Sequence, residues 1–182
     1  SVLFCFSCHS LQKLPTKPNF FEALGLPPNY AQNSQQVETK YQRLLGEIHP
    51  DFYAHLQTWE KRQSLESTSI LNNAFKTLQN PLSRAEYLLS LLVQSSELNS
   101  RSLPPHFLEE VFELQEKLDE FLAQENQSEE LLQLERDFQS RLEQSYQRIE
   151  NLFSEIPEVP TVAQLQTIQT QLNASRYIQR LA

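Results

Sequence analysis

The stretch LLGEIHPDFYAHLQTW, residues 44–59, contains the first side chains that could do chemistry. His49 and Asp51 flank Pro50 and could share a proton as an acid–base pair. A catalytic pair also needs a pocket and a positioned substrate, and the sequence shows neither a nucleophile motif nor a glycine-rich phosphate loop. Three interpretations stay open at this point: an ordinary loop, a catalytic dyad, or an exposed tip that contacts another protein.

The two cysteines, Cys5 and Cys8, form the second such group. A Cys-x-x-Cys knuckle gives two thiolates to zinc, whereas a tetrahedral site needs four ligands. His9 could be a third ligand, and the sequence has no second cysteine pair. A redox pair usually opens a helix after a strand, and no such context is visible. We therefore expect spare thiols and no cofactor, with a zinc half-site completed by a second chain as the alternative.

The apolar spacing around His-Pro-Asp predicts two helices. The first covers residues 34–48 with a cap at Asn33 or Ser34, and it ends there because Pro50 disfavours the α conformation in the residue before it. The second covers about residues 59–79. Their apolar faces are Val37, Tyr41, Leu44 and Ile48, and Leu71, Phe75 and Leu78. Facing stripes and a short loop predict an antiparallel pair with the His-Pro-Asp residues at its exposed tip.

The rest of the chain also reads as helical, and only 2 of 182 residues are glycine. Gly25 caps a short helical turn, and Pro81 opens a further helix. Pro105 opens the first of three long helices, and the others cover residues 129–156 and 161–181. The apolar seam of the first is Phe107, Val111, Leu114, Leu118 and Phe121. The fold class is therefore all-α, with a three-helix bundle at the C-terminus.

The net charge of −8 is unevenly distributed. Residues 1–94 carry eight basic and seven acidic side chains, or +1, and residues 95–182 carry seven and sixteen, or −9. The acidic half argues against nucleic acid, and no apolar run approaches the roughly 20 residues of a membrane span. Ser1 is not a start methionine, so a targeting signal could be missing. We expect an N-terminal extension, a first domain, a linker and a C-terminal domain at residues 1–18, 19–93, 94–103 and 104–182.

His-Pro-Asp between antiparallel helices resembles the J-domain of DnaJ-type co-chaperones. The run ILNNAFKTLQNPLSRAEYLL, residues 70–89, resembles the end of a J-domain's third helix and the start of its fourth. Within J-domains the match is to the HscB family of iron–sulfur co-chaperones, and FLEEVFELQEKLDE (107–120) and the terminal RYIQRL agree with it in order. FCFSCHSLQ resembles one half of the N-terminal zinc knuckle of some members.

This resemblance implies a chaperone-binding site in the first domain. His49, Pro50 and Asp51 match the motif that stimulates ATP hydrolysis by a DnaK-class chaperone such as HscA. Lys40 and Arg43 match basic residues that meet an acidic surface on that chaperone. Just before the motif this chain has Gly46 and Glu47, where many J-domains are basic. We therefore expect a weaker electrostatic contribution to chaperone binding.

A second site is expected on the bundle. Leu108 and Phe112 are each one position off the apolar seam, which rotates them by about 100° and predicts an exposed ridge. The alternative is packing against a neighbouring helix or the first domain. The resemblance matches six positions to the contact with the IscU-type iron–sulfur scaffold: Leu108, Phe112, Glu113, Glu116, Glu120 and Tyr177. Glu109 stands where relatives can have an apolar residue.

Together these features predict a co-chaperone that is not an enzyme. It would hold an IscU-type scaffold with one domain and a DnaK/HscA-class ATPase with the other, and so promote cluster transfer. Two alternatives are a J-protein serving an unrelated client and a helical interaction module with no ATPase partner. The expected location is the bacterial cytoplasm, or the mitochondrial matrix in a eukaryote.

Overall fold

The computed structural model describes residues 1–56, 58–93, 98–122 and 128–181. It divides into two compact units, Ser1–Leu88 and Leu89–Ala182, and each is described by itself. The division falls inside a helix, before the domain end expected at residue 93. The linker expected at 94–103 lies partly outside the described residues, so those domain limits stay predictions. None of the described helices is long and apolar enough to cross a lipid bilayer.

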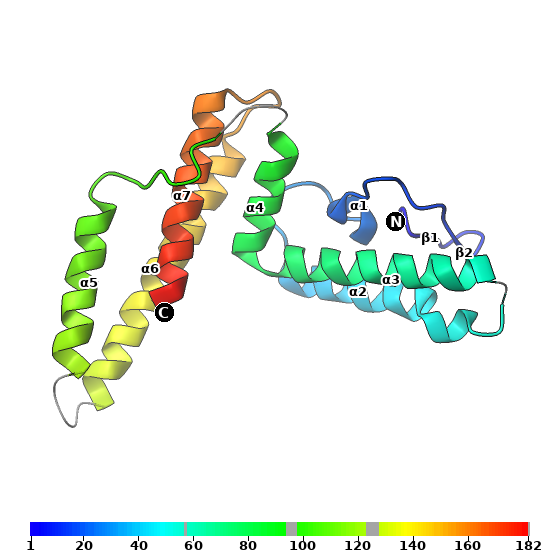
Figure 1. The fold of residues 1–182 in the computed structure, drawn as a ribbon, viewed down its shortest axis with the longest axis horizontal. Helices are drawn as coiled ribbons and strands as arrows, with labels where there is room; N and C mark the ends of the chain where they lie inside the picture. Colours follow the sequence, from blue (N-terminus) through cyan, green and yellow to red (C-terminus); the bar gives the residue numbers. More distant parts are fainter. Residues whose placement is uncertain (57, 94–97, 123–127, 182) are drawn as a thin grey trace. The chain divides into compact units, whose positions relative to one another are not determined.

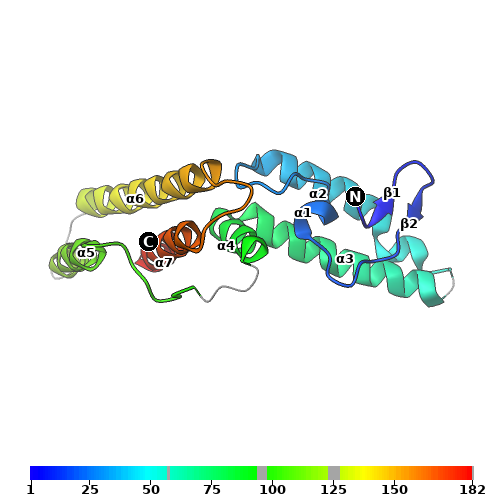
Figure 2. The ribbon, with the colours of Figure 1, turned by 90° about the horizontal axis from the view of Figure 1, so that it is seen from above.

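The first unit is a pair of antiparallel helices with short elements around it. Figures 1 and 2 show α2 and α3 side by side along most of their length. The elements in chain order are β1 (Phe4–Cys5), β2 (Ser10–Leu11), α1 (Phe20–Leu24), α2 (Ser34–Ile48), the 3-10 turn η1 (Pro50–Tyr53), α3 (Thr58–Gln79) and α4 (Pro81–Leu92). The long pair places η1, and with it the His-Pro-Asp residues, at the turn between α2 and α3.

Apolar packing between α2 and α3 forms the core of this unit. The predicted stripes are buried at Val37, Leu44, Ile48, Leu71 and Leu78. The other two predicted core residues, Tyr41 and Phe75, are half-buried and stack with ring centroids 4.1 Å apart. These contacts confirm the predicted antiparallel pair.

The ends of these helices follow the predicted capping chemistry. The Asn33 side chain accepts a hydrogen bond from the Gln36 amide and caps α2. Gly25 ends α1 with φ at 64°, a left-handed conformation that a residue with a Cβ adopts at a cost. Pro81 is the first residue of α4. His49 leaves the helix with ψ at 134°, as expected for a residue before proline.

An N-terminal hairpin that the sequence pattern did not predict packs onto this pair. Strands β1 and β2 are antiparallel, with Phe4 opposite Leu11 and Cys5 opposite Ser10. Leu3 and Phe4 are buried, β1 contacts α2, and β2 contacts α3. Two residues per strand are too few to show an alternating pattern, which is why the sequence suggested only an extension.

The second unit contains the three expected long helices: α5 (Phe107–Leu122), α6 (Ser128–Ser154) and α7 (Val162–Leu181). Helices α6 and α7 pack side by side (Figure 1), and five of their apolar residues are buried: Phe138, Ile149, Leu165, Ile168 and Leu172. Thr161 caps α7 as predicted, because its hydroxyl accepts from the Gln164 amide while the Gln164 side chain accepts from the Thr161 amide. The described residues therefore form an all-α fold of an antiparallel helix pair and a C-terminal bundle, with one small hairpin.

The predicted start of α5 was wrong. Pro105 does not open the helix, which begins two residues later at Phe107. The reason is His106, whose φ of 62° is left-handed and cannot continue a right-handed helix. The seam residues Leu114, Leu118 and Phe121 have side chains outside the described set, whereas Phe107 and Val111 are buried as predicted.

One buried hydrogen bond fixes the end of α2 next to the His-Pro-Asp residues. The Ser64 hydroxyl donates to the Ile48 carbonyl at 2.6 Å, and both residues are fully buried. A carbonyl in the last turn of a helix has no intrahelical partner, so a donor from α3 is needed. Thr68 donates to the same oxygen at a longer distance, 3.3 Å.

We predict that Ser64→Ala destabilises the first unit by about 1–2 kcal/mol, because a buried acceptor loses its best donor. Thr68→Ala should cost less, since its bond is longer. Urea unfolding followed by far-UV circular dichroism measures both. A larger loss for Thr68→Ala than for Ser64→Ala would show that Ser64 does not anchor this carbonyl.

Candidate functional site

The His-Pro-Asp residues form a solvent-facing tip. The Asp51 amide donates to His49 Nδ1 at 3.3 Å, and the same nitrogen lies 3.5 Å from Asp51 Oδ2. The Asp51 side chain is 87% exposed and that of His49 is 43% exposed. An acid–base pair needs a water-excluding pocket to hold a substrate. These exposures argue against a catalytic dyad and favour a contact tip.

Several bonds hold the tip rigidly on the helix pair. The Phe52 amide donates to the His49 carbonyl at 3.1 Å, which closes the turn. The Tyr53 hydroxyl donates to the Glu47 carbonyl at 3.0 Å and ties the turn to the last part of α2. Burial, and then the Glu47 and Glu60 carboxylates, raise the pKa of Tyr53, so its phenol stays a proton donor. Sequence reasoning missed Tyr53 and Ser64 as positioning residues.

The two basic candidates, Lys40 and Arg43, lie on α2 and do not contact the tip in the structure. They are nine and six residues before His49, roughly 14 and 9 Å along the helix axis. The Lys40 ammonium donates to the Gly25 carbonyl. The Arg43 guanidinium lies 4.2 Å from the centre of the Phe6 ring, a cation–π contact with the N-terminal hairpin. No sequence signal pointed to Phe6.

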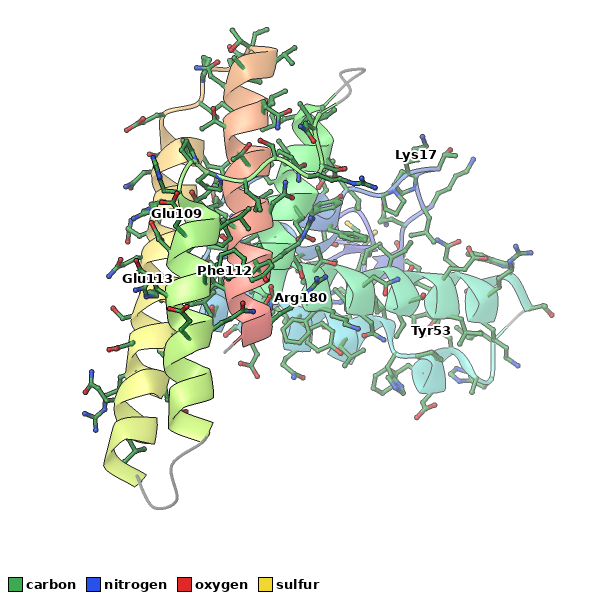
Figure 3. The ribbon with its side chains drawn as sticks, turned by 60° about the vertical axis from the view of Figure 1, so that its left-hand side comes forward. Lys17, Tyr53, Glu109, Phe112, Glu113 and Arg180 are labelled. Atoms are coloured by element: carbon green, nitrogen blue, oxygen red, sulfur yellow. The ribbon has the colours of Figure 1, made fainter. Side chains whose placement is uncertain are left out.

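The predicted ridge on α5 is exposed. Leu108 is 52% exposed and Phe112 is 63% exposed. Glu113 and Glu116 are exposed beside them, and Figure 3 shows Phe112 and Glu113 on α5. The side chain of Glu120 lies outside the described set. The exposures agree with the ridge geometry and argue against packing on a neighbouring helix, whereas the other alternative, packing against the first domain, stays a hypothesis.

Tyr177 is the last candidate for this surface. It is half-buried and packs against the buried cluster of Phe107, Val111 and Ala174, with its ring edge-on to Phe107 at 5.9 Å. Tyr177 follows Ala174 by three residues, so both lie on the same face of α7. The structure therefore brings Tyr177 to the first turn of α5, where its ring is partly buried, and its contact with the scaffold stays a prediction.

Cys5 ends strand β1 and Cys8 lies in the loop of the hairpin, so together they supply two ligands. Backbone amides of Cys8 and then Ser7 donate to the Cys5 sulfur and lower the pKa of that thiol. Cys8 is exposed, and its sulfur is 2.9 Å from the Ser10 hydroxyl. Within the described residues, no three His, Cys, Asp or Glu side chains gather as a metal site would require. The loop fits a thiolate pair but not a closed zinc site.

Comparison with known proteins finds HscB co-chaperones among the matches. The family model described as "HSCB C-terminal oligomerisation domain" matches residues 103–182. The co-chaperone protein HscB of Proteus mirabilis (strain HI4320) is 37% identical over 131 residues, covering 70% of this chain and 72% of the relative. A co-chaperone HscB homologue of Aromatoleum aromaticum (strain DSM 19018 / LMG 30748 / EbN1) is 30% identical over 148 residues, 81% of this chain and 83% of that protein.

Solved structures share the fold over most of the chain. The crystal structure of human co-chaperone protein HscB superposes with a TM-score of 0.79 at 24% identity, covering 100% of this chain and 87% of the human one. Chaperone HscB from Vibrio cholerae superposes with a TM-score of 0.75 at 25% identity, covering 90% and 93%. With relatives at 30% identity or more matched over more than two thirds of their length, this chain belongs to the HscB family of co-chaperone proteins.

Proposed function

We propose that this chain stimulates the ATPase of a DnaK/HscA-class chaperone through its tip and binds an IscU-type iron–sulfur scaffold through its C-terminal bundle. The observation that carries the proposal is the exposed, rigid His-Pro-Asp tip on an antiparallel helix pair in a member of the HscB family. In this role the chain is not itself an enzyme, and its partners include neither nucleic acid nor a membrane. The proposed location is the bacterial cytoplasm, or the mitochondrial matrix in a eukaryote.

The tip would act by differential binding. A protein shifts the conformational equilibrium of its partner only by binding one state better than the other. The Asp51 carboxylate is held near His49 by the turn, so it meets the chaperone in a fixed position. A fixed carboxylate can favour a hydrolysis-competent arrangement of the ATPase over other arrangements. Lys40 and Arg43 would add attraction to an acidic surface on the same partner.

The bundle would act as a tether. Leu108 and Phe112 offer apolar area, and the carboxylates of Glu113, Glu116 and Glu120 offer charge around it. Holding the scaffold on the chain that contacts the chaperone raises the scaffold's effective concentration there. The iron–sulfur cluster is cargo in this scheme, carried by the scaffold and released to recipient proteins.

The first test changes the tip. His49→Gln should leave the fold intact, because the side chain is partly exposed, and should abolish stimulation of the chaperone ATPase. His55→Gln is the matched control, since His55 is exposed and lies outside the motif. Steady-state ATP turnover of a purified DnaK-class chaperone measures both. Full stimulation by His49→Gln would rule out the J-domain function.

The second test changes the ridge. Leu108→Ala with Phe112→Ala should weaken scaffold binding by at least about tenfold, since interface anchors commonly cost roughly 1 kcal/mol or more each and 1.4 kcal/mol is one decade. Leu132→Ala is the control, because Leu132 is 49% exposed on α6 of the same unit. Calorimetric titration of the scaffold gives the affinities.

Tyr177→Ala is kept separate from the ridge variant. Its contacts with Phe107 and Val111 mean that this change lowers the melting temperature as well as any affinity for the scaffold.

Unchanged scaffold affinity in the Leu108/Phe112 double variant would contradict the scaffold site. It would favour the second candidate function, a J-protein that serves another client.

The third test concerns metal. With two thiolates and no further ligand beside them in the described residues, we propose that a monomer of this chain holds no closed zinc site. Elemental analysis of the purified chain should show well under one zinc per monomer. One tightly held zinc per monomer that disappears in Cys5→Ser would overturn this.

A further inference from the structure

Large exposed apolar side chains follow the His-Pro-Asp motif in the sequence. Within the described part of the first unit there are three: Phe52 at 57% exposed, Trp59 at 63% and Leu65 at 58%. All three lie in η1 or the first eight residues of α3. An exposed apolar patch can mark an interaction surface, and Phe52 and Trp59 are the two of these residues that lie nearest the motif in the sequence.

Phe52 and Tyr53 are adjacent aromatic residues with different roles. Tyr53 is half-buried and uses its hydroxyl to bind the Glu47 carbonyl. Phe52 faces solvent, and its ring lies edge-on to His49 with centroids 6.2 Å apart. The turn therefore directs one aromatic side chain inward, where it holds the tip, and leaves the other exposed directly beside the His-Pro-Asp residues.

The basic side chains of α2 contribute less attraction for a partner at the tip than their number suggests. Lys40 is bonded to the Gly25 carbonyl, and Arg43 stacks on Phe6. Gly46 and Glu47 add no positive charge between Arg43 and the tip. A contact with these properties gains more from burying apolar area than from attraction between charges.

We propose that Phe52 and Trp59 are apolar anchors that extend the tip's contact with the DnaK-class chaperone. The partner surface that receives them is apolar and borders the surface that receives His49 and Asp51. Phe52 is continuous with the motif through its ring contact with His49, and Trp59 lies in the first turn of α3. Aromatic residues of this kind dominate the binding energy of protein interfaces. The inference rests on the proposed function and adds residues to its first site.

Leu65 provides a matched control. It is as exposed as Phe52 and lies on α3 with Trp59, six residues further along. Six residues correspond to a rotation of about 120° around the helix, so Leu65 and Trp59 face different directions. Truncation of Leu65 therefore removes a similar apolar group from outside the proposed contact.

The experiment measures chaperone ATP turnover as a function of the concentration of each variant. Phe52→Ala and Trp59→Ala should each raise the concentration for half-maximal stimulation about fivefold to tenfold, while the maximal stimulation is kept. Leu65→Ala should match the unmodified chain. Circular dichroism spectra that match confirm that each variant is folded, as expected for exposed positions.

The outcomes separate this inference from the proposed function. If the unmodified chain does not stimulate the ATPase, both the proposed function and this inference are contradicted. If it stimulates and both aromatic variants behave like it, the inference alone is overturned. Equal weakening by Leu65→Ala would also overturn it, because the effect would not be specific to the tip. A lower maximum at an unchanged half-maximal concentration would do the same, since Phe52 would then act only through His49.

Discussion

The end of α2 carries the constraint on which the tip depends. Pro50 turns the chain out of the helix at His49, which leaves the buried Ile48 carbonyl without an intrahelical donor. A buried carbonyl must find a partner, and Ser64 of α3 supplies it. This bond ties the last turn of α2 to a defined position along α3. The orientation of the tip is therefore set by two helices that pack side by side along most of their length.

Rigidity of the tip matters because its residues are exposed. The surrounding protein makes few contacts with a side chain as exposed as that of Asp51. Its contribution to binding therefore depends on the position in which the turn holds it. The bonds from Phe52 to His49 and from Tyr53 to Glu47 remove freedom that a partner would otherwise have to remove on binding. The turn is therefore already ordered before a partner binds, and the conformational entropy lost in ordering it is offset by the free energy of folding.

The two candidate surfaces lie in different compact units and share no residues. They also differ in chemistry: the tip combines a carboxylate, an imidazole and aromatic rings, whereas the α5 ridge combines two apolar side chains with glutamates. Formal charge follows the same division, at +1 for residues 1–94 and −9 for residues 95–182. Two surfaces with different chemistry suit the two different partners of the proposed function.

The sequence by itself determined the elements whose signals are local. Helical spacing and caps at Asn33, Gly25 and Pro81 predicted where helices begin and end, and the off-seam positions of Leu108 and Phe112 predicted their exposure. The His-Pro-Asp motif and its neighbours predicted the family, which the relatives confirm. Each of these depends on residues within a few positions of one another.

Only the tertiary structure decided the contacts between distant segments. The stacking of Phe6 on Arg43, the bond from Ser64 to Ile48 and the packing of Tyr177 on Phe107 join residues that no short pattern links. The left-handed backbone at His106 could not be predicted from the sequence either, because histidine adopts that conformation only occasionally. Long-range packing selects among side-chain partners that are equivalent in the sequence, so these features appear only once the chain is folded.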